Sequence, residues 1–184
     1  MNDKLENRIE SDFTTKNGMP LLQNKAKNSG FDIGTSTIYR QLPVGLFESS
    51  KAKKSEGCVF TGKKSAIDLW TVSDDTISIF ELKAENKKVG IITEIMLYAN
   101  YIHDMYTAKH TTFNPLKPSP KSKRGYASLY GAMGGLINVM AYFLTDALHP
   151  LITAEILNLM NDNGNSTIKY GNLSYELGNG LIVK

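Results

Sequence analysis

The sequence predicts an α/β (α+β) domain in which helices flank a central mixed β-sheet, and three observations lead to this prediction. The 184 residues fit one domain of ordinary size. Hydrophobic residues make up 41% of the chain, which is enough to build a core. Segments of helical periodicity precede and follow a clear pair of strands, an order typical of helices packed on a sheet.

The first helix is predicted over residues 3–16, because apolar side chains recur on one face at four-residue spacing (Leu5, Ile9 and Phe13). Asn17-Gly18 is a signal that ends helices. The next segments are predicted to be a short helix near 21–28, an extended piece near 35–42 and a loop over 43–57.

The region 58–84 carries the clearest β-strand pattern. Val59 and Phe60 begin this region, and Gly62 interrupts it. Residues 66–72 are predicted to be a strand, Ser73 to Thr76 a turn, and residues 77–83 the returning strand. A β-hairpin is therefore expected here.

The rest of the chain is predicted to be mainly helical. The expected elements are a helix over 89–108 with an apolar stripe, a loop over 109–125, a long apolar helix over about 128–147, a shorter helix over 151–160 after His149-Pro150, and a final hairpin of 166–173 with 175–183. All of it is assigned to one domain of residues 1–184, with a core of about 1–108 and a helical and hairpin part of about 126–184.

Residues 126–145 are uncharged and have the length of a membrane-spanning helix. Their glycines and the polar Ser128 and Asn138 favour a buried or interface helix instead, so no membrane partner is expected. Gly131, Gly134 and Gly135 would allow close approach of a second helix, which makes this 127–147 helix a candidate interface for a homo-oligomer.

The composition limits the available chemistry. Cys58 is the single cysteine, which excludes a disulfide framework and a cysteine-rich zinc site. The charged N-terminus has no apolar core of a secretory signal, so a cytoplasmic location is expected. The net charge of +3 permits a polyanionic partner, and basic residues gather at Lys63, Lys64, Lys117, Lys121, Lys123 and Arg124.

The hairpin geometry brings three charged side chains together. With the turn centred on Asp74-Asp75, Asp68 faces Glu81, while Glu81 and Lys83 share a face of their strand. Two carboxylates beside apolar neighbours repel each other and lose hydration, a conflict that a bound divalent cation resolves. Oxygen ligands without nearby His or Cys favour Mg²⁺ or Mn²⁺.

A plainer interpretation is an ordinary ion pair between Asp68 and Lys83, with Glu81 at the solvent edge. The helix that follows adds a second piece, because Glu94 and Tyr98 are four residues apart and lie on one helix face. This helix begins soon enough after Lys83 to pack back over the strand end.

These residues resemble the PD-(D/E)XK nuclease superfamily. The resemblance rests on Ile67-Asp68, on Glu81-Leu82-Lys83 and on Glu94 with Tyr98, where Glu94 replaces the usual Gln and Ile67 the usual Pro. It covers about residues 60–106 and the first helix, and it implies a restriction-endonuclease-like core.

The resemblance implies phosphodiester hydrolysis. Metal ligands would be Asp68, Glu81, the backbone carbonyl of Leu82 and an acid of the first helix, with Glu10 the best match and Glu6 the second. Lys83 would orient or activate the attacking water. Glu94 would bond a metal-bound water and Tyr98 would order the helix or contact a phosphate. Backbone phosphates would be met by Lys63, Lys64, Lys121, Lys123 and Arg124.

Three function hypotheses follow from different classes, and the third of them is a structural or interaction protein in which 127–147 is a helical interface. The first is a Mg²⁺-dependent nuclease that acts on nucleic acid, with DNA the favoured substrate. The second is a catalytically silent version of the same fold that binds nucleic acid or a protein. Retention of Asp68, Glu81 and Lys83 favours the first, because a silent domain has no physical reason to keep two facing carboxylates.

Overall fold

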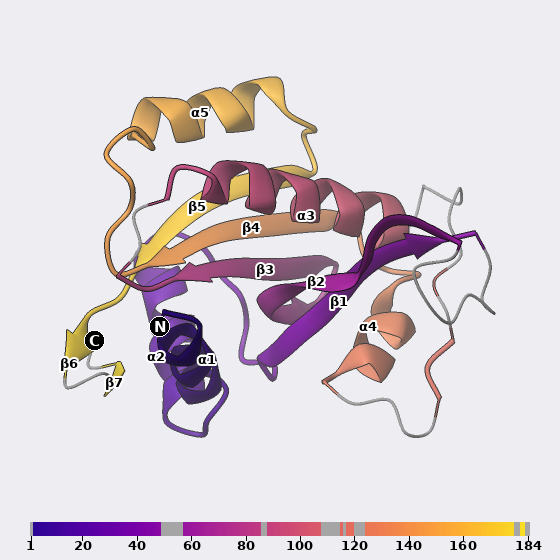
Figure 1. The fold of residues 1–184 in the computed structure, drawn as a ribbon, viewed down its shortest axis with the longest axis horizontal. Helices are drawn as coiled ribbons and strands as arrows, with labels where there is room; N and C mark the ends of the chain where they lie inside the picture. The colour runs from indigo at the N-terminus through magenta and orange to yellow at the C-terminus, as the bar shows by residue number, and fades with distance from the viewer. Residues whose placement is uncertain are drawn as a thin grey trace.

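A five-stranded mixed sheet forms the centre of the computed structural model (Figure 1). Its strands, in spatial order, are β1 (Tyr39–Phe47), β2 (Cys58–Ser73), β3 (Thr76–Lys83), β4 (Asn138–Thr145) and β5 (Ile168–Ser174). The β1–β2 and β2–β3 pairs are antiparallel, whereas β3–β4 and β4–β5 are parallel. The structure describes residues 2–48, 57–85, 88–107, 115, 117–119, 124–178 and 181–182.

Helices cover both faces of this sheet, which confirms the predicted fold class. The helices are α1 (Asn2–Phe13), α2 (Gly18–Asn28), α3 (Ile91–Tyr106), α4 (Tyr126–Ala132) and α5 (Ala154–Asn163). Helices α1 and α2 lie on one side, and α3 and α5 lie on the other (Figure 1). The first helix, predicted over 3–16, forms as α1, and its Ile9 and Phe13 are fully buried against the sheet.

The alternation of side chains along β3 divides the core into two parts. Ile77 and Ile79 pack under α3, while Phe80 and Leu82 pack against α1 and α2. Successive side chains on a strand point to opposite faces. Glu81 and Lys83 share the parity of Ile77 and Ile79, so the strand places them on the α3 side.

The predicted long helix over 128–147 is wrong. Helix α4 ends at Ala132, and β4 begins at Asn138 after Gly134-Gly135. β4 is buried on both faces in the middle of the sheet, and such a strand reads as a continuous apolar run that periodicity cannot distinguish from a buried helix. Of the three glycines of the predicted helical interface, only Gly131 lies in a helix, and association through this segment stays a prediction. In the part of the chain that the structure describes, no helix has the length and apolar character needed to cross a membrane.

Two smaller predictions are also wrong. Residues 43–47, expected to be loop, complete β1. The final hairpin of 166–173 with 175–183 does not form: β5 pairs in parallel with β4, while β6 (Leu177–Gly178) and β7 (Leu181–Ile182) make a separate two-stranded sheet. Ile168 and Leu173 are buried on opposite faces of β5. Burial on both faces favours pairing of this strand within the main sheet.

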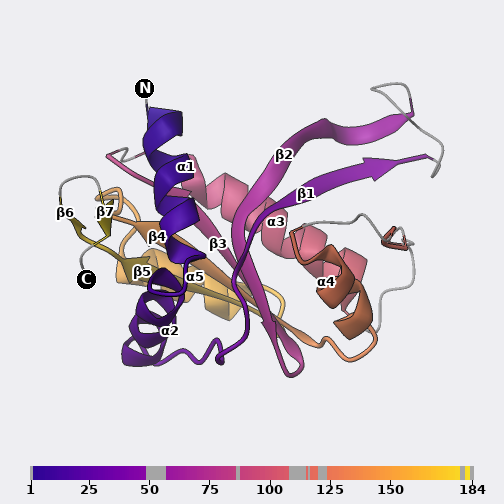
Figure 2. The same cartoon turned by 90° about the horizontal axis from the view of Figure 1, so that it is seen from below.

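The β2–β3 hairpin has the predicted register, and it ends in a fork. Pairing runs from Ser73 opposite Thr76 to Leu69 opposite Phe80. Beyond Leu69, β2 pairs only with β1, and the two strands turn away from β3 (Figure 2). Asp68 is the first β2 residue past the last pair, so it stands at the base of the fork.

The central position of β4 can be tested by truncating Leu144, which is fully buried. Leu144→Ala is expected to lower the free energy of unfolding by about 2–5 kcal/mol in chemical denaturation, because it leaves a cavity in the core. Ile137→Ala is the control, since Ile137 is 47% exposed just before the strand, and a change within about 1 kcal/mol is expected. Equal losses in the two variants would contradict a central β4.

Candidate active site

Asp68 is held by groups on both sides of the fork. The Leu82 backbone N–H donates to Asp68 Oδ2 at 2.9 Å. A side chain of β2 therefore accepts a hydrogen bond from a backbone amide of β3 beyond the last pair of the two strands. The Gln41 amide Nε2 makes a longer contact of 3.4 Å with Asp68 Oδ1. The carboxylate thereby receives one donor on each oxygen, and its position is set by β1 and β3 together.

Glu81 and Lys83 form the second part of the site, under the first turns of α3. Lys83 Nζ lies 2.5 Å from Glu81 Oε1 and 3.1 Å from Glu94 Oε2. Glu81 is only 4% exposed, and its other oxygen, Oε2, is buried without a hydrogen-bond partner among the described residues. The site therefore contains a carboxylate oxygen that has lost its water and gained no donor.

Burial raises the pKa of both carboxyl groups. The pKa of Asp68 rises from 3.8 to about 7, mainly through desolvation, with the Leu82 hydrogen bond lowering it and the charge of Glu10 raising it further. The pKa of Glu81 is raised well above its ordinary value by burial and then by the charge of Asp68. Both ionised forms therefore lack compensating positive charge beyond that of Lys83.

Lys83 and Glu94 remain charged beside these groups. Burial favours neutral Lys83, but the carboxylate of Glu81 outweighs it, and the pKa of Lys83 is raised. Burial also favours protonated Glu94, yet its bonds to Glu81 and Lys83 prevail and its pKa is lowered. Glu94 keeps 48% of its side chain exposed, so α3 carries the charge at the open edge of the site.

Tyr98 lies one helical turn after Glu94 and is 8% exposed. Its burial, followed by the negative charges of Glu81 and Glu94, raises the pKa of the phenol to about 12. The phenol therefore stays neutral and can donate a hydrogen bond near the carboxylates. The expectation that α3 folds back over the strand end, with Glu94 and Tyr98 on one face, matches this arrangement.

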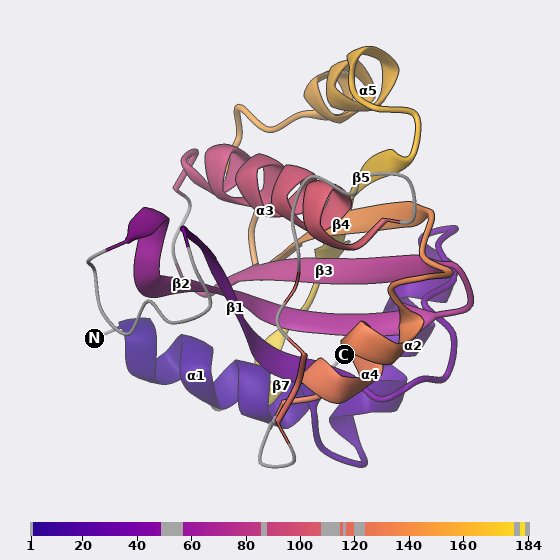
Figure 3. The same ribbon diagram turned by 90° about the vertical axis from the view of Figure 1, so that its right-hand side faces the viewer.

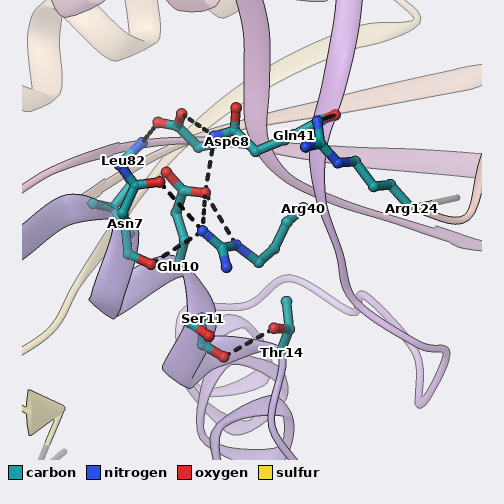
Figure 4. A network of polar contacts seen from close by, with 9 residues as sticks. All are labelled: Asn7, Glu10, Ser11, Thr14, Arg40, Gln41, Asp68, Leu82 and Arg124. Carbon is teal, nitrogen blue, oxygen red and sulfur yellow. Dashed lines mark hydrogen bonds and ion pairs between the residues drawn. The ribbon is translucent and has the colours of Figure 1, made fainter. Parts of the chain in front are cut away.

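Helix α1 brings a further acid to the fork from the other side of the sheet. Glu10 is 3% exposed, and its Oε2 accepts hydrogen bonds from Arg40 Nε (3.2 Å), Arg40 Nη2 (3.1 Å) and Gln41 Nε2 (2.9 Å) (Figure 4). Glu6, one turn earlier, accepts from the Ala84 N–H at 3.2 Å. Both acids act on the pKa of Asp68, and Glu10 has the larger effect.

The simple ion pair between Asp68 and Lys83 is not the arrangement that forms. The ammonium group pairs with Glu81 and Glu94 instead. Glu81 is buried rather than at a solvent edge. The structure thus brings Asp68, Glu81, Lys83, Glu94 and Tyr98 into one neighbourhood, with Glu10 and Leu82 beside Asp68.

The predicted phosphate-contacting residues are placed only in part. Arg124 is exposed, and its Nη1 donates to the Gln41 backbone carbonyl at 3.4 Å, which brings the end of the basic segment to β1 beside the site. The side chains of Lys63 and Lys64 and the whole of Lys121 and Lys123 lie outside the described residues.

Sequence reasoning missed Arg40 and Gln41 as members of this network. They lie in an extended segment without a catalytic motif, and only the pairing of β1 with β2 brings them to Asp68. An arginine and a glutamine directly before the apolar part of β1 are a weak signal that the pattern of the sequence alone does not distinguish from surface residues.

The residues at the fork supply oxygen donors of the kind that a divalent cation binds, and one of these oxygens, Glu81 Oε2, has no hydrogen-bond partner among the described residues. The unpartnered Glu81 Oε2 and the raised pKa values of two adjacent carboxyl groups are the marks of a missing positive charge. Within the described ranges, no three His, Cys, Asp or Glu side chains converge closely enough to form a complete ligand set. Lys83 pairs with one oxygen of Glu81, and Arg40 pairs with Glu10. These two basic side chains therefore keep the acidic side chains apart.

The described histidines stand away from this chemistry. His103 is buried, with Nδ1 at 3.1 Å from Asp104 Oδ1 and Nε2 at 3.0 Å from the Asn165 amide. His149 Nδ1 accepts from the Leu151 N–H. These contacts join side chains and backbone away from the fork, and His110 lies outside the described residues.

Comparison with protein-family models, with curated proteins and with solved structures gives no match to this chain. The resemblance to the PD-(D/E)XK superfamily therefore stays a prediction that rests on the residues themselves.

The raised pKa of Asp68 predicts a pH-dependent stability of the metal-free protein. Because the folded state holds this proton more tightly than the unfolded chain, its stabilising contribution is full below about pH 4 and is lost as the pH rises through about 7. Urea unfolding should show a loss of about 4 kcal/mol over this window, and Asp68→Asn should reduce that loss. An unchanged pH dependence in the variant would contradict the buried, uncompensated carboxylate.

Proposed function

We propose that this protein is a Mg²⁺- or Mn²⁺-dependent nuclease that hydrolyses phosphodiester bonds in nucleic acid, with DNA as the favoured substrate. The observation that carries the proposal is the buried Glu81 Oε2, which has no hydrogen-bond partner among the described residues and lies beside a second carboxyl group whose pKa is raised to about 7. A purely structural site is expected to satisfy a buried carboxylate oxygen such as Glu81 Oε2 with a donor.

Asp68 and Glu81 are the proposed cation ligands, with the Leu82 carbonyl and Glu10 completing the set. Asp68 retains lone pairs on both oxygens after its bonds to Leu82 and Gln41. A divalent cation bound there would stabilise charge on a phosphoryl oxygen and lower the pKa of a coordinated water. Oxygen-only ligands select hard cations such as Mg²⁺ and Mn²⁺.

Lys83 supplies the fixed positive charge of the proposed mechanism. Its ammonium group is held by Glu81 and Glu94 and stays protonated, so it can orient the attacking water or offset charge on the phosphate without itself giving up a proton. Glu94 fixes Lys83 from the exposed side and can accept a hydrogen bond from water. Tyr98 is a neutral donor that can contact a phosphate oxygen.

The catalytically silent alternative has one observation in its favour. Lys83 already neutralises part of the charge on Glu81, so the fold can exist without a metal ion. A silent domain that binds nucleic acid through Arg124 and the neighbouring lysines would bind the polyanion without cleaving it. The two proposals differ in whether a divalent cation binds at Asp68 and Glu81.

The first test is calorimetric titration of Mg²⁺ and Mn²⁺ together with cleavage assays on duplex DNA, single-stranded DNA and RNA. Asp68→Ala and Glu81→Ala should each abolish metal binding and lower cleavage by at least about 100-fold, because a ligand is lost. Asp162→Ala, an exposed acid on α5, is the control and should leave both unchanged. Metal binding without cleavage of any substrate would favour the silent domain, and no metal binding by the wild type would sink the mechanism.

Replacement of the lysine separates binding from chemistry. Lys83→Met keeps the length of the side chain but removes its charge, so metal binding should persist while cleavage falls by about 100–1000-fold. Lys27→Met, on the exposed part of α2, serves as the matched control. Loss of metal binding in Lys83→Met would show that the lysine supports the fold of the site rather than the reaction.

The two acids of α1 make different predictions. Glu10→Gln should weaken Mn²⁺ affinity by about 10–100-fold, because Glu10 belongs to the network that reaches Asp68. Glu6→Gln should change the affinity much less, since Glu6 accepts from the Ala84 N–H. The reverse order of effects, read by calorimetry, would assign the α1 ligand to Glu6.

A further inference from the structure

Two neighbouring strands change faces at the same point, and Gln41 and Asp68 occupy that point. On β1, Tyr39 and Leu42 both pack in the α3-side core although they are three residues apart. On β2, Ile67 and Trp70 do the same. Regular alternation would place residues three apart on opposite faces, so each strand resets its alternation between them.

The backbone conformation of Gln41 interrupts the alternation of side chains along β1. Its φ of 54° lies in the left-handed region, which a residue with a side chain adopts only at a cost in free energy. Arg40 and Leu42 pair with Leu69 and Ile67, so Gln41 lies across from Asp68. As a result, the consecutive side chains of Arg40 and Gln41 both turn toward Glu10 rather than to opposite faces (Figure 4).

The Gln41 amide then joins the two acids. Nε2 donates to Glu10 Oε2 at 2.9 Å and contacts Asp68 Oδ1 at 3.4 Å. The amide has two N–H groups and no charge, so it can hold one oxygen of each carboxylate without competing with a cation for the site. Gln41 and Arg40 thus meet on one oxygen of Glu10, Oε2.

The backbone of Gln41 extends this link outward. Its carbonyl accepts a hydrogen bond from Arg124 Nη1 at 3.4 Å. Gly125, the residue after Arg124, has a φ of 77° and lies against the ring of Tyr39, so that an added Cβ would come within 2.4 Å of the ring. One residue thus contacts α1, β2 and the segment that leads into α4. No residue of the predicted motifs does this.

We propose that Gln41 is a positioning residue that aligns Glu10 with Asp68 so that both carboxylates can bind one divalent cation. The inference rests on the proposed function and adds to it Gln41, a residue that is not among those predicted from the motifs. Loss of an amide that orients metal ligands weakens metal affinity by about 10–100-fold.

Gln41→Gly is the variant that isolates the amide. Glycine adopts the φ of 54° without strain, so the strand can keep its course while the side chain is lost. The matched control is Gln23→Ala, which removes a glutamine amide that donates to the Ser36 carbonyl at 3.1 Å, remote from the acids. Thermal unfolding of the metal-free proteins shows whether each variant is folded.

The measurement is calorimetric titration with Mn²⁺ and the Mg²⁺ dependence of DNA cleavage. We expect Gln41→Gly to raise the Mn²⁺ Kd and the Mg²⁺ concentration for half-maximal cleavage by about 10–100-fold, while the rate at saturating Mg²⁺ stays within about threefold of the wild type. Gln23→Ala should change neither. A role in folding alone would lower the melting temperature without this split.

Two outcomes would overturn the inference, and they are distinct. If the wild type binds Mn²⁺ and the Kd of Gln41→Gly lies within about twofold of the wild-type value, Gln41 has no positioning role and the proposed function stays in place. A wild type that binds no Mn²⁺ would remove both together.

Discussion

Asp68 and Glu81 place two carboxylates in the interior at the point where β2 leaves β3, and the other elements of the site supply the groups that make this tolerable. The end of the ladder at Leu69 and Phe80 frees the Leu82 N–H, which Asp68 then accepts. Charges buried in this way are costly unless they are paired. Lys83, the Leu82 N–H and the Gln41 amide offset part of that cost, whereas the charge of Glu10 adds to it.

The sheet lies between α3 on one side and α1 on the other (Figure 3). Helix α3 closes the site on one face of the sheet through Glu94 and Tyr98, while α1 brings Glu10 from the other. Access from both faces is possible only because the strands diverge there. A continuous sheet would separate Glu10 from Asp68, so the fork is what allows acids of different layers to share the Gln41 amide.

The parts of the site with local sequence signals were predictable. The turn at Asp74-Asp75 fixes the register of the hairpin, and the alternation of side chains then places Glu81 and Lys83 together. Four-residue spacing predicted that Glu94 and Tyr98 share a helix face. The fold class followed from the same local signals, because each predicted strand or helix near the site was amphipathic or bounded by a turn.

The remaining features depend on contacts between distant residues. The sequence of β4 predicts a helix, because a strand that is buried on both faces lacks the alternation of polar and apolar residues that identifies a strand. The bond between Arg40 and Glu10 joins residues 30 apart, and the left-handed φ of Gln41 has no signature in a glutamine. Their positions follow from the packing of α1 against the sheet and from the β1–β2 register, both of which are tertiary properties.

The most direct measurement is a crystal structure of the protein grown with Mn²⁺, with the ion located by its anomalous scattering. The account predicts an anomalous peak within about 2.0–2.3 Å of carboxylate oxygens of both Asp68 and Glu81, with Glu81 Oε2 among its ligands. Saturating Mn²⁺ with no peak at the fork, or with a peak bound elsewhere, would contradict the claim that these carboxylates are buried in order to hold a cation.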